Sequence, residues 1–232
     1  MELRREDPVH VLDLGSEGLR FTPDTVAELL VHLADVAAAP APRALVTTAT
    51  GKSWALGLDL EWILANPDRM DELVQAMHEL LARLLELPVP TVAAIGGHAF
   101  AGGAMLALAH DFRVMRADRG YFCLPEIDLA IPFTPGLTAL IAGRLPARSA
   151  HEAMITGRRY GGPEAIFAGM VDRVAEADDV VPAAVEIAAG LAGRDARTLG
   201  QIKTELYAAT LAALRDRDAN RRAAVREPSG GR

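Results

Sequence analysis

The segment VPTVAAIGGHAFAGGAMLALAHDFRVM, residues 89–115, decides how this chain folds. It contains an apolar run, 91–95, that is typical of a buried strand, followed by a glycine-rich loop over 96–103. The next residues, 104–109, predict a helix, and 111–115 predict another strand. Strands that alternate with helices in this way indicate an α/β fold.

The same alternation precedes this segment. Residues 8–14 alternate apolar and polar side chains and predict a strand. Thr22 predicts the cap of a helix that has proline in its first turn and ends near Ala38. A short buried strand is predicted over 43–48, and residues 49–57 are expected to form a loop.

Helices dominate the rest of the predicted structure. Apolar residues at helical spacing predict a helix over 68–86. A strand is expected at 120–123, and helices are expected at 135–144, 148–155, 179–193 and 196–215. Residues 218–232 are polar and are expected to be frayed. The pattern therefore changes near residue 175 from α/β to helical only.

Composition narrows the classes of function. The chain has 232 residues and a formal net charge of −7, which disfavours binding to nucleic acid or to an anionic membrane. No apolar stretch approaches the roughly 18 residues of a membrane-spanning helix. A single cysteine, Cys123, excludes an internal disulfide. The charged N-terminus does not resemble a signal peptide and the terminal REPSGGR is not a peroxisomal signal, so we expect a cytoplasmic protein.

Several familiar motifs fail at one residue each. The segment from Thr50 to Ser53 imitates a phosphate-binding loop, but Val46 stands where that loop needs glycine. A dinucleotide fingerprint would need glycine in place of Ala99. His78 and His151 are each followed by glutamate, but neither has a second histidine at metalloprotease spacing, so we expect no metal.

Two glycine-containing loops remain as candidate site elements. One leads from Gly57 into Leu58, and the other ends at Gly102 and Gly103, where a helix is predicted to begin. Backbone N–H groups from both loops could hold a developing oxyanion, because a helix N-terminus carries positive partial charge. Alternatively, the glycines only allow close packing of helix and strand, and spacing alone does not decide between these two interpretations.

Three segments together resemble the enoyl-CoA hydratase/isomerase (crotonase) superfamily. The resemblance runs from about residue 6 to 210 and rests on residues 89–115, on ALVTTATGKSWALGLDLEW (44–62) and on HEAMITGRRYGGPEAIFAGMVDRVAE (151–176). The segments AHDFRVM (109–115) and LPEID (124–128) are most similar to those of plant-type Δ3,Δ2-enoyl-CoA isomerases. The resemblance implies a spiral of ββα units, with residues 1–175 as a core that holds an acyl-CoA site.

The resemblance also implies how the chain assembles and what it uses. Residues 176–232 would form a helical oligomerisation region that builds a homotrimer or a hexamer. The substrate would be an acyl-CoA of fatty acid metabolism, and no cofactor is implied beyond the coenzyme A moiety of that substrate.

The carboxylates point to one reaction of the superfamily. By position, the oxyanion hole would be formed by the backbone N–H groups of Leu58 and Gly102. Hydratases of the family use two glutamates, and here the first position is Met105 while the second is Glu126. A single carboxylate is suited to moving a proton from C2 to C4 of a 3-enoyl-CoA, with Glu126 as the base. Asp128 is a reserve candidate, because it would point the same way as Glu126 if this segment were extended, and Asp59 is expected to cap the following helix.

Further contacts with the substrate are predicted more broadly. The acyl pocket would be lined by Trp62, Phe100, Met105 and Phe133, while Lys52, Arg69 and Lys203 are candidates for contacts with CoA phosphates. Another crotonase reaction, such as hydration or decarboxylation, is the alternative activity, because superfamily membership does not determine the reaction. A non-catalytic acyl-CoA-binding subunit is the alternative outside enzymes.

Overall fold

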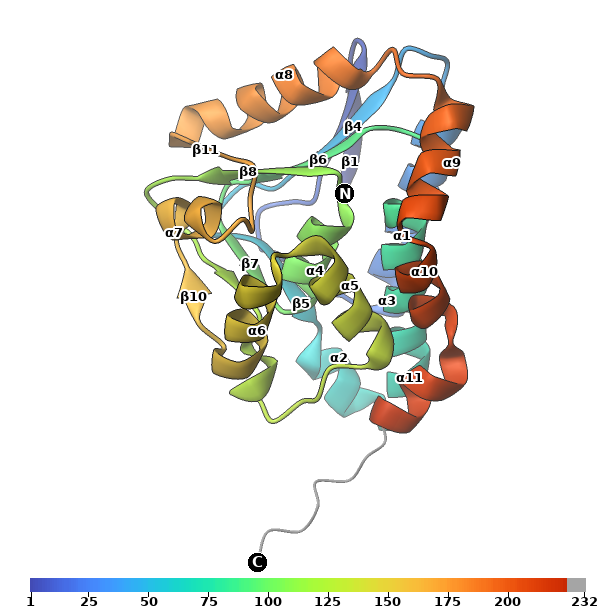
Figure 1. Cartoon of the computed structure of the whole chain (residues 1–232), viewed down its shortest axis with the longest axis vertical. Coiled ribbons are helices and arrows are strands. Elements are labelled where there is room, and N and C mark those ends of the chain that lie inside the picture. Colours follow the sequence, from blue (N-terminus) through green and yellow to red (C-terminus); the bar gives the residue numbers. More distant parts are fainter. Residues whose placement is uncertain (225–232) are drawn as a thin grey trace, which may run out of the picture.

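The computed structural model describes residues 1–224, which form two sheets surrounded by helices (Figure 1). The larger sheet has the strand order β1-β2-β4-β6-β8-β11, and the smaller one has the order β10-β9-β7-β5-β3. The strands span Glu2–Glu6 (β1), Val9–Asp13 (β2), Leu19–Phe21 (β3), Ala44–Thr48 (β4), Ser53–Leu58 (β5), Thr91–Ile95 (β6), His98–Phe100 (β7), Phe112–Arg116 (β8), Phe122–Cys123 (β9), Arg159–Tyr160 (β10) and Arg173–Ala175 (β11).

The helices connect and cover these sheets. They span Pro23–Ala38 (α1), Leu60–Ala65 (α2), Met70–Leu85 (α3), Gly102–Ala109 (α4), Pro135–Arg144 (α5), Ala147–Thr156 (α6), Gly162–Phe167 (α7), Val180–Leu191 (α8), Ala196–Leu206 (α9), Ala208–Arg215 (α10) and Arg217–Ala224 (α11). None of the helices in residues 1–224 is long and apolar enough to cross a membrane.

From β2 to β9, consecutive strands alternate between the two sheets, whereas β1 pairs with β2 in the larger sheet and β10 pairs with β9 in the smaller one. The chain passes from β2 to β3, then through α1 to β4 and β5, through α2 and α3 to β6 and β7, and through α4 to β8 and β9. All pairs of strands are parallel except β1 with β2 and β9 with β10. This winding confirms the predicted spiral of ββα units.

Burial explains why the strands read as apolar runs. Every residue of β4 and β6 is buried, because helices cover one face of the larger sheet and the smaller sheet with its helices covers the other. Helix α8 lies along the outer face of the larger sheet, where its alanines pack on β4, β6 and β8 (Figure 1).

The structure corrects several sequence-based boundaries. The predicted loop 49–57 contains all of β5 except Leu58, and the glycine-rich loop contains β7. The helix predicted over 196–215 is divided at Tyr207 into α9 and α10. The first part of 218–232 is helical in α11 rather than frayed, while 225–232 lies outside the described residues.

The C-terminal helices are joined to the rest of the fold. Lys203 of α9 is 3% exposed, and its Nζ donates to the carbonyls of Leu87 and Val89 at 2.9 Å each. The same ammonium lies 2.7 Å from the carboxylate of Asp111. Helix α10 packs on α5 and α3 beside the site described below. The functional division near residue 175 stays a prediction.

Candidate active site

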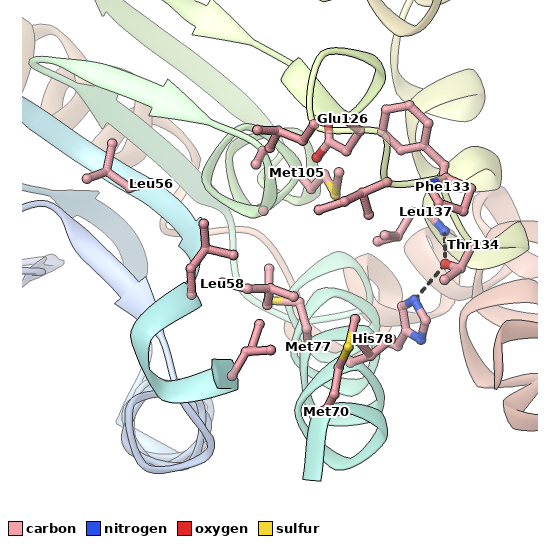
Figure 2. Close-up of a pocket in the computed structure, with 18 residues that line it drawn as sticks. Leu56, Leu58, Met70, Met77, His78, Met105, Glu126, Phe133, Thr134 and Leu137 are labelled. Carbon is pink, nitrogen blue, oxygen red and sulfur yellow. Dashed lines mark hydrogen bonds between the residues drawn. The ribbon is translucent and has the colours of Figure 1, made fainter. Parts of the chain in front are cut away.

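A cavity of about 270 Å³ opens between α3, α4, α5 and the end of β5 (Figure 2). Its lining consists of Leu56, Leu58, Leu60, Ile63, Met70, Val74, Met77, His78, Ala101, Gly102, Met105, Glu126, Leu129, Ile131, Pro132, Phe133, Thr134 and Leu137. Only three of these 18 residues have polar side chains, namely Glu126, His78 and Thr134. A cavity of this kind suits a mostly apolar ligand that a few polar groups orient.

Backbone from two loops meets at one edge of the cavity. Gly57 has a φ of 97°, and a Cβ added to it would lie 3.1 Å from the amide nitrogen of Gly102. A Cβ added to Gly102 would lie 3.3 Å from the Cα of Gly57. The close approach of the two loops therefore depends on glycine at both positions.

The orientation of the N–H groups follows from the secondary structure. Gly102 is the first residue of α4, so its N–H has no acceptor within the helix. The N–H of Asp59 donates to the carbonyl of Phe21 in β3 at 3.0 Å. Since N–H groups alternate in direction along a strand, the N–H of Leu58 points away from β3, toward the side of β7 and the loop that leads into α4. Two donors on adjacent loops form the kind of arrangement that binds an oxyanion.

Glu126 supplies the carboxylate of the cavity. It lies in a 3₁₀ helix, Pro125–Ile127, and is 6% exposed. Its Oε2 has no hydrogen-bond partner among residues 1–224. Burial raises the pKa of this carboxyl group to about 7, because the charged form loses its hydration. Glu126 can therefore both accept and return a proton near neutral pH.

Met105 adjoins Glu126 in the wall of the cavity. It lies one turn into α4 from Gly102 and is 2% exposed (Figure 2). Its side chain cannot ionise or activate a water molecule. The position next to Glu126 is thus apolar, and the cavity holds one carboxylate among its lining residues.

A sequence profile described as "Enoyl-CoA hydratase/isomerase" matches residues 20–227. The chain belongs to this family. Enoyl-CoA delta isomerase 3 of Arabidopsis thaliana is 35% identical over 203 residues, which cover 83% of this chain and 85% of that protein. A putative enoyl-CoA hydratase of Thermus thermophilus is 35% identical over 166 residues, covering 67% of this chain and 62% of that one.

The fold also matches a solved member of the enoyl-CoA isomerases. Human mitochondrial delta3-delta2-enoyl-CoA isomerase superposes with a TM-score of 0.88, at 22% identity, over 96% of this chain and 90% of that chain. At this identity the likeness concerns the fold. Together with the profile match, it confirms the crotonase-type architecture that the resemblance implies.

Five of the predicted site residues lie together in this cavity. Leu58, Gly102, Met105, Glu126 and Phe133 all line the cavity. Their roles toward a substrate stay predictions.

Three other predicted contacts lie outside the lining. Trp62 is half-buried beneath the guanidinium of Arg69, which lies 5.4 Å from the ring centroid. Phe100 packs against His98 on the smaller sheet, and Lys52 is exposed immediately before β5. A role for these three residues in binding stays a prediction.

Neither of the two carboxylates considered in addition to Glu126, Asp59 and Asp128, lines the cavity. Asp59 caps α2 as predicted, because its Oδ1 accepts from the N–H of Trp62 at 2.9 Å. Asp128 is exposed and does not line the cavity, because the segment is a 3₁₀ helix rather than extended. The idea that Asp128 points the same way as Glu126 is therefore wrong.

Lys203 and Arg69, which are the other two candidates for contacts with CoA phosphates, have partners within the protein. Lys203 is buried against Asp111, so the idea that it contacts CoA phosphates is wrong. Arg69 is exposed and pairs with Glu72 at 2.8 Å.

Two polar residues of the cavity, His78 and Thr134, are not among the site residues predicted from the sequence. Both are buried, and His78 Nε2 lies 2.8 Å from Thr134 Oγ1. One signal was available, because His78 interrupts the apolar stripe of α3 that contains Val74, Met77 and Leu81. A histidine in such a stripe is expected to have a buried partner.

Proposed function

We propose that the chain is a Δ3,Δ2-enoyl-CoA isomerase, an acyl-CoA-thioester enzyme that moves a double bond from C3 to C2. The observation that carries this proposal is the single carboxylate, Glu126, set beside Met105 in an apolar cavity. Relatives named as enoyl-CoA delta isomerases support it.

The proposed reaction is a proton transfer within one substrate. The thioester oxygen accepts hydrogen bonds from the N–H groups of Leu58 and Gly102. The Glu126 carboxylate removes a proton from C2, and the C2–H electron pair delocalises into a dienolate whose negative charge rests on the thioester oxygen. The same proton returns from Glu126 to C4, so the double bond ends between C2 and C3. No group is needed beyond the coenzyme A moiety of the substrate.

The surroundings of Glu126 favour this transfer over the addition of water. A pKa of about 7 allows Glu126 to hold the proton during the life of the dienolate and then to release it. Hydration would need a second polar group to orient a water molecule, and Met105 occupies the neighbouring position. Hydratase activity is the second candidate, because a putative hydratase is among the relatives.

The direct test compares two substrates and two variants. With 3-hexenoyl-CoA, the conjugated-enoyl absorbance should rise while the mass stays constant. Glu126→Gln should abolish the rise, whereas Asp128→Asn, an exposed carboxylate in the same segment, should leave it unchanged. A gain of one water on 2-hexenoyl-CoA without isomerisation would favour the hydratase. Turnover of neither substrate would favour another thioester reaction or a binding subunit.

The chain is further proposed to act as an oligomer of the size expected from the resemblance, a trimer or hexamer. Helix α9 leaves Ile202 and Leu206 more than half exposed, and an exposed apolar helix face is typical of a subunit contact. Light scattering coupled to gel filtration would measure the mass. A monomer would contradict this part of the proposal.

A further inference from the structure

Apart from Glu126, the polar side chains in the cavity lining are those of His78 in α3 and Thr134, the residue that caps α5. These two side chains form a pair. The two side chains are 1% and 4% exposed, respectively. The residues around them in the lining, such as Met77, Phe133 and Leu137, are apolar. Figure 2 shows the pair on the side of the cavity away from Leu58, which belongs to the proposed thioester end.

Counting hydrogens shows that this pair has a donor to spare. A neutral imidazole carries one N–H and a threonine hydroxyl carries one O–H, so the pair holds two polar hydrogens. The contact between His78 Nε2 and Thr134 Oγ1, at 2.8 Å, uses one of them. The N–H of Leu137 donates to Thr134 Oγ1 at 3.3 Å, which uses a lone pair and no hydrogen.

The spare hydrogen lies at one of two atoms. If His78 Nε2–H donates to Thr134, then the Thr134 O–H is free to donate to a ligand. If Thr134 donates instead, the hydrogen lies on His78 Nδ1, which is buried with no partner among residues 1–224. A buried donor without an acceptor costs about 1–3 kcal/mol, so the first arrangement is stabilised whenever a ligand supplies an acceptor beside Thr134.

The environment also limits the charge of that acceptor. Burial lowers the pKa of His78 to about 4, so the ring is neutral near pH 7, although nearby Asp71 acts in the opposite direction. A carboxylate placed here would have no counter-ion among the cavity residues and would be costly to bury. A hydroxyl or keto oxygen can accept from Thr134 without this cost.

We propose that the pair of His78 and Thr134 selects acyl chains that carry a neutral hydrogen-bond acceptor, a hydroxyl or keto oxygen, beyond the reacting carbons. This inference rests on the proposed function in taking the cavity as the acyl site. It assigns a substrate class to that site: oxygenated acyl thioesters, in preference to plain alkyl thioesters of the same length.

Calorimetric binding of saturated thioesters tests the inference without requiring turnover. Octanoyl-CoA is compared with a set of octanoyl-CoAs that carry one hydroxyl or keto oxygen, placed in turn on each carbon from C5 to C8. For at least one position, the oxygenated ligand should bind the wild-type protein about three- to tenfold more tightly than octanoyl-CoA.

Four variants separate recognition from folding. The double variant His78→Leu with Thr134→Val replaces both partners by apolar groups, which preserves packing, and should reverse the preference. Thr134→Val alone should also lose the preference. Thr134→Ser keeps the hydroxyl and the cap of α5 and should retain it. Leu81→Met, an apolar change of similar volume on the same helix but outside the lining, should leave the ratio of the two affinities as in wild type.

The outcomes distinguish this inference from the proposed reaction. Tighter binding of octanoyl-CoA than of every oxygenated ligand would overturn the inference, as would an unchanged ratio in the double variant. A preference that depends on Thr134, in a protein that isomerises no 3-enoyl-CoA, would support the inference and reject the isomerase. Failure to bind any of the thioesters would reject both.

Discussion

Gly57 and Gly102 are in backbone contact across the gap between β5 and α4. A Cβ on Gly57 would lie 2.9 Å from the Ala101 Cβ and 3.1 Å from the Gly102 nitrogen, and a Cβ on Gly102 would lie 3.3 Å from the Gly57 Cα. Two loops that are separated in the sequence by α2, α3 and β6 are thereby held at a separation that leaves little room for a Cβ on either residue. The proposed oxyanion hole depends on this contact.

The neighbouring glycines of α4 should separate activity from stability. Gly102→Ala should fold, because its nearest contacts are at 3.3 Å or more, but should lower kcat/KM by at least about tenfold by displacing the loops. Gly103→Ala should lower the free energy of unfolding by several kcal/mol, because its Cβ would lie 2.2 Å from the carbonyl oxygen of Ala55. Urea unfolding and kinetics of both variants check this. Equal losses of stability would contradict it.

The pH profile of isomerisation should report Glu126. The carboxylate must be unprotonated to act as a base, and burial raises its pKa to about 7. We therefore expect kcat/KM to rise with pH and to level off above about pH 7. Stopped-flow rates between pH 5 and 9 measure the profile. A level profile down to pH 5 would show that Glu126 is not the base.

Glu126 should also make stability depend on pH. Its pKa rises from 4.5 in the unfolded chain to about 7 in the folded protein, so the folded state holds the proton more tightly. The stabilisation is full below about pH 4.5 and is lost as the pH rises to about 7. Wild type should therefore lose about 3 kcal/mol relative to Glu126→Gln over this range. Urea unfolding of both proteins at pH 4.5 and 8 measures how the free energy of unfolding changes with pH in each. The histidines contribute equally to both changes, so their contribution cancels when wild type is compared with Glu126→Gln.

A second carboxylate at position 105 should change the reaction. Met105→Glu places an acid beside Glu126, where like charge raises the pKa of one of the two groups. We expect isomerisation to fall at least about tenfold and hydration of 2-hexenoyl-CoA to become measurable. The variant Met105→Leu is the matched control and should behave as wild type. Product mass spectrometry distinguishes the reactions, and isomerisation unaffected by the glutamate would argue against the importance of this position.

Lys203 should matter for stability rather than for CoA. Lys203→Met leaves Asp111 and two backbone carbonyls without their ammonium, which should cost about 3 kcal/mol. Gln201→Met, on an exposed position of the same helix, should cost little. Urea unfolding measures both, and titration with acyl-CoA should show equal affinities at a temperature where both variants are folded. A selective loss of affinity in Lys203→Met would restore the idea of a phosphate contact.

Sequence patterns predicted those elements whose signals are local. The helix cap at Thr22 and the strand at 91–95 depend on neighbouring residues, and both are confirmed. Strand β5 falls largely within the predicted loop 49–57, and local patterns do not indicate it because its pairing partners, β3 and β7, lie far away in the sequence. Tertiary pairing of this kind overrides local propensity.

The site residues also fall into two groups, those that sequence motifs predict and those that only tertiary contacts bring together. Glu126 and Gly102 stand in motifs that carry a family resemblance, so they could be named before any coordinates. The contact between His78 and Thr134 joins residues that are 56 positions apart, and no spacing rule links them. Burial of Lys203 could not be foreseen either, because a lysine on an amphipathic helix is usually solvated.

The last described helix has a consequence for how the protein is made. Asn220 of α11 accepts a hydrogen bond at 2.8 Å from the N–H of Gly136, 84 positions earlier, in the first turn of α5. That turn follows Thr134 and bounds the cavity. On the ribosome, α5 emerges long before Asn220 exists to hold it. The first turn of α5 therefore lacks this support until synthesis has passed Asn220, and a nascent chain carries Glu126 for some time before that wall of the cavity is held in place.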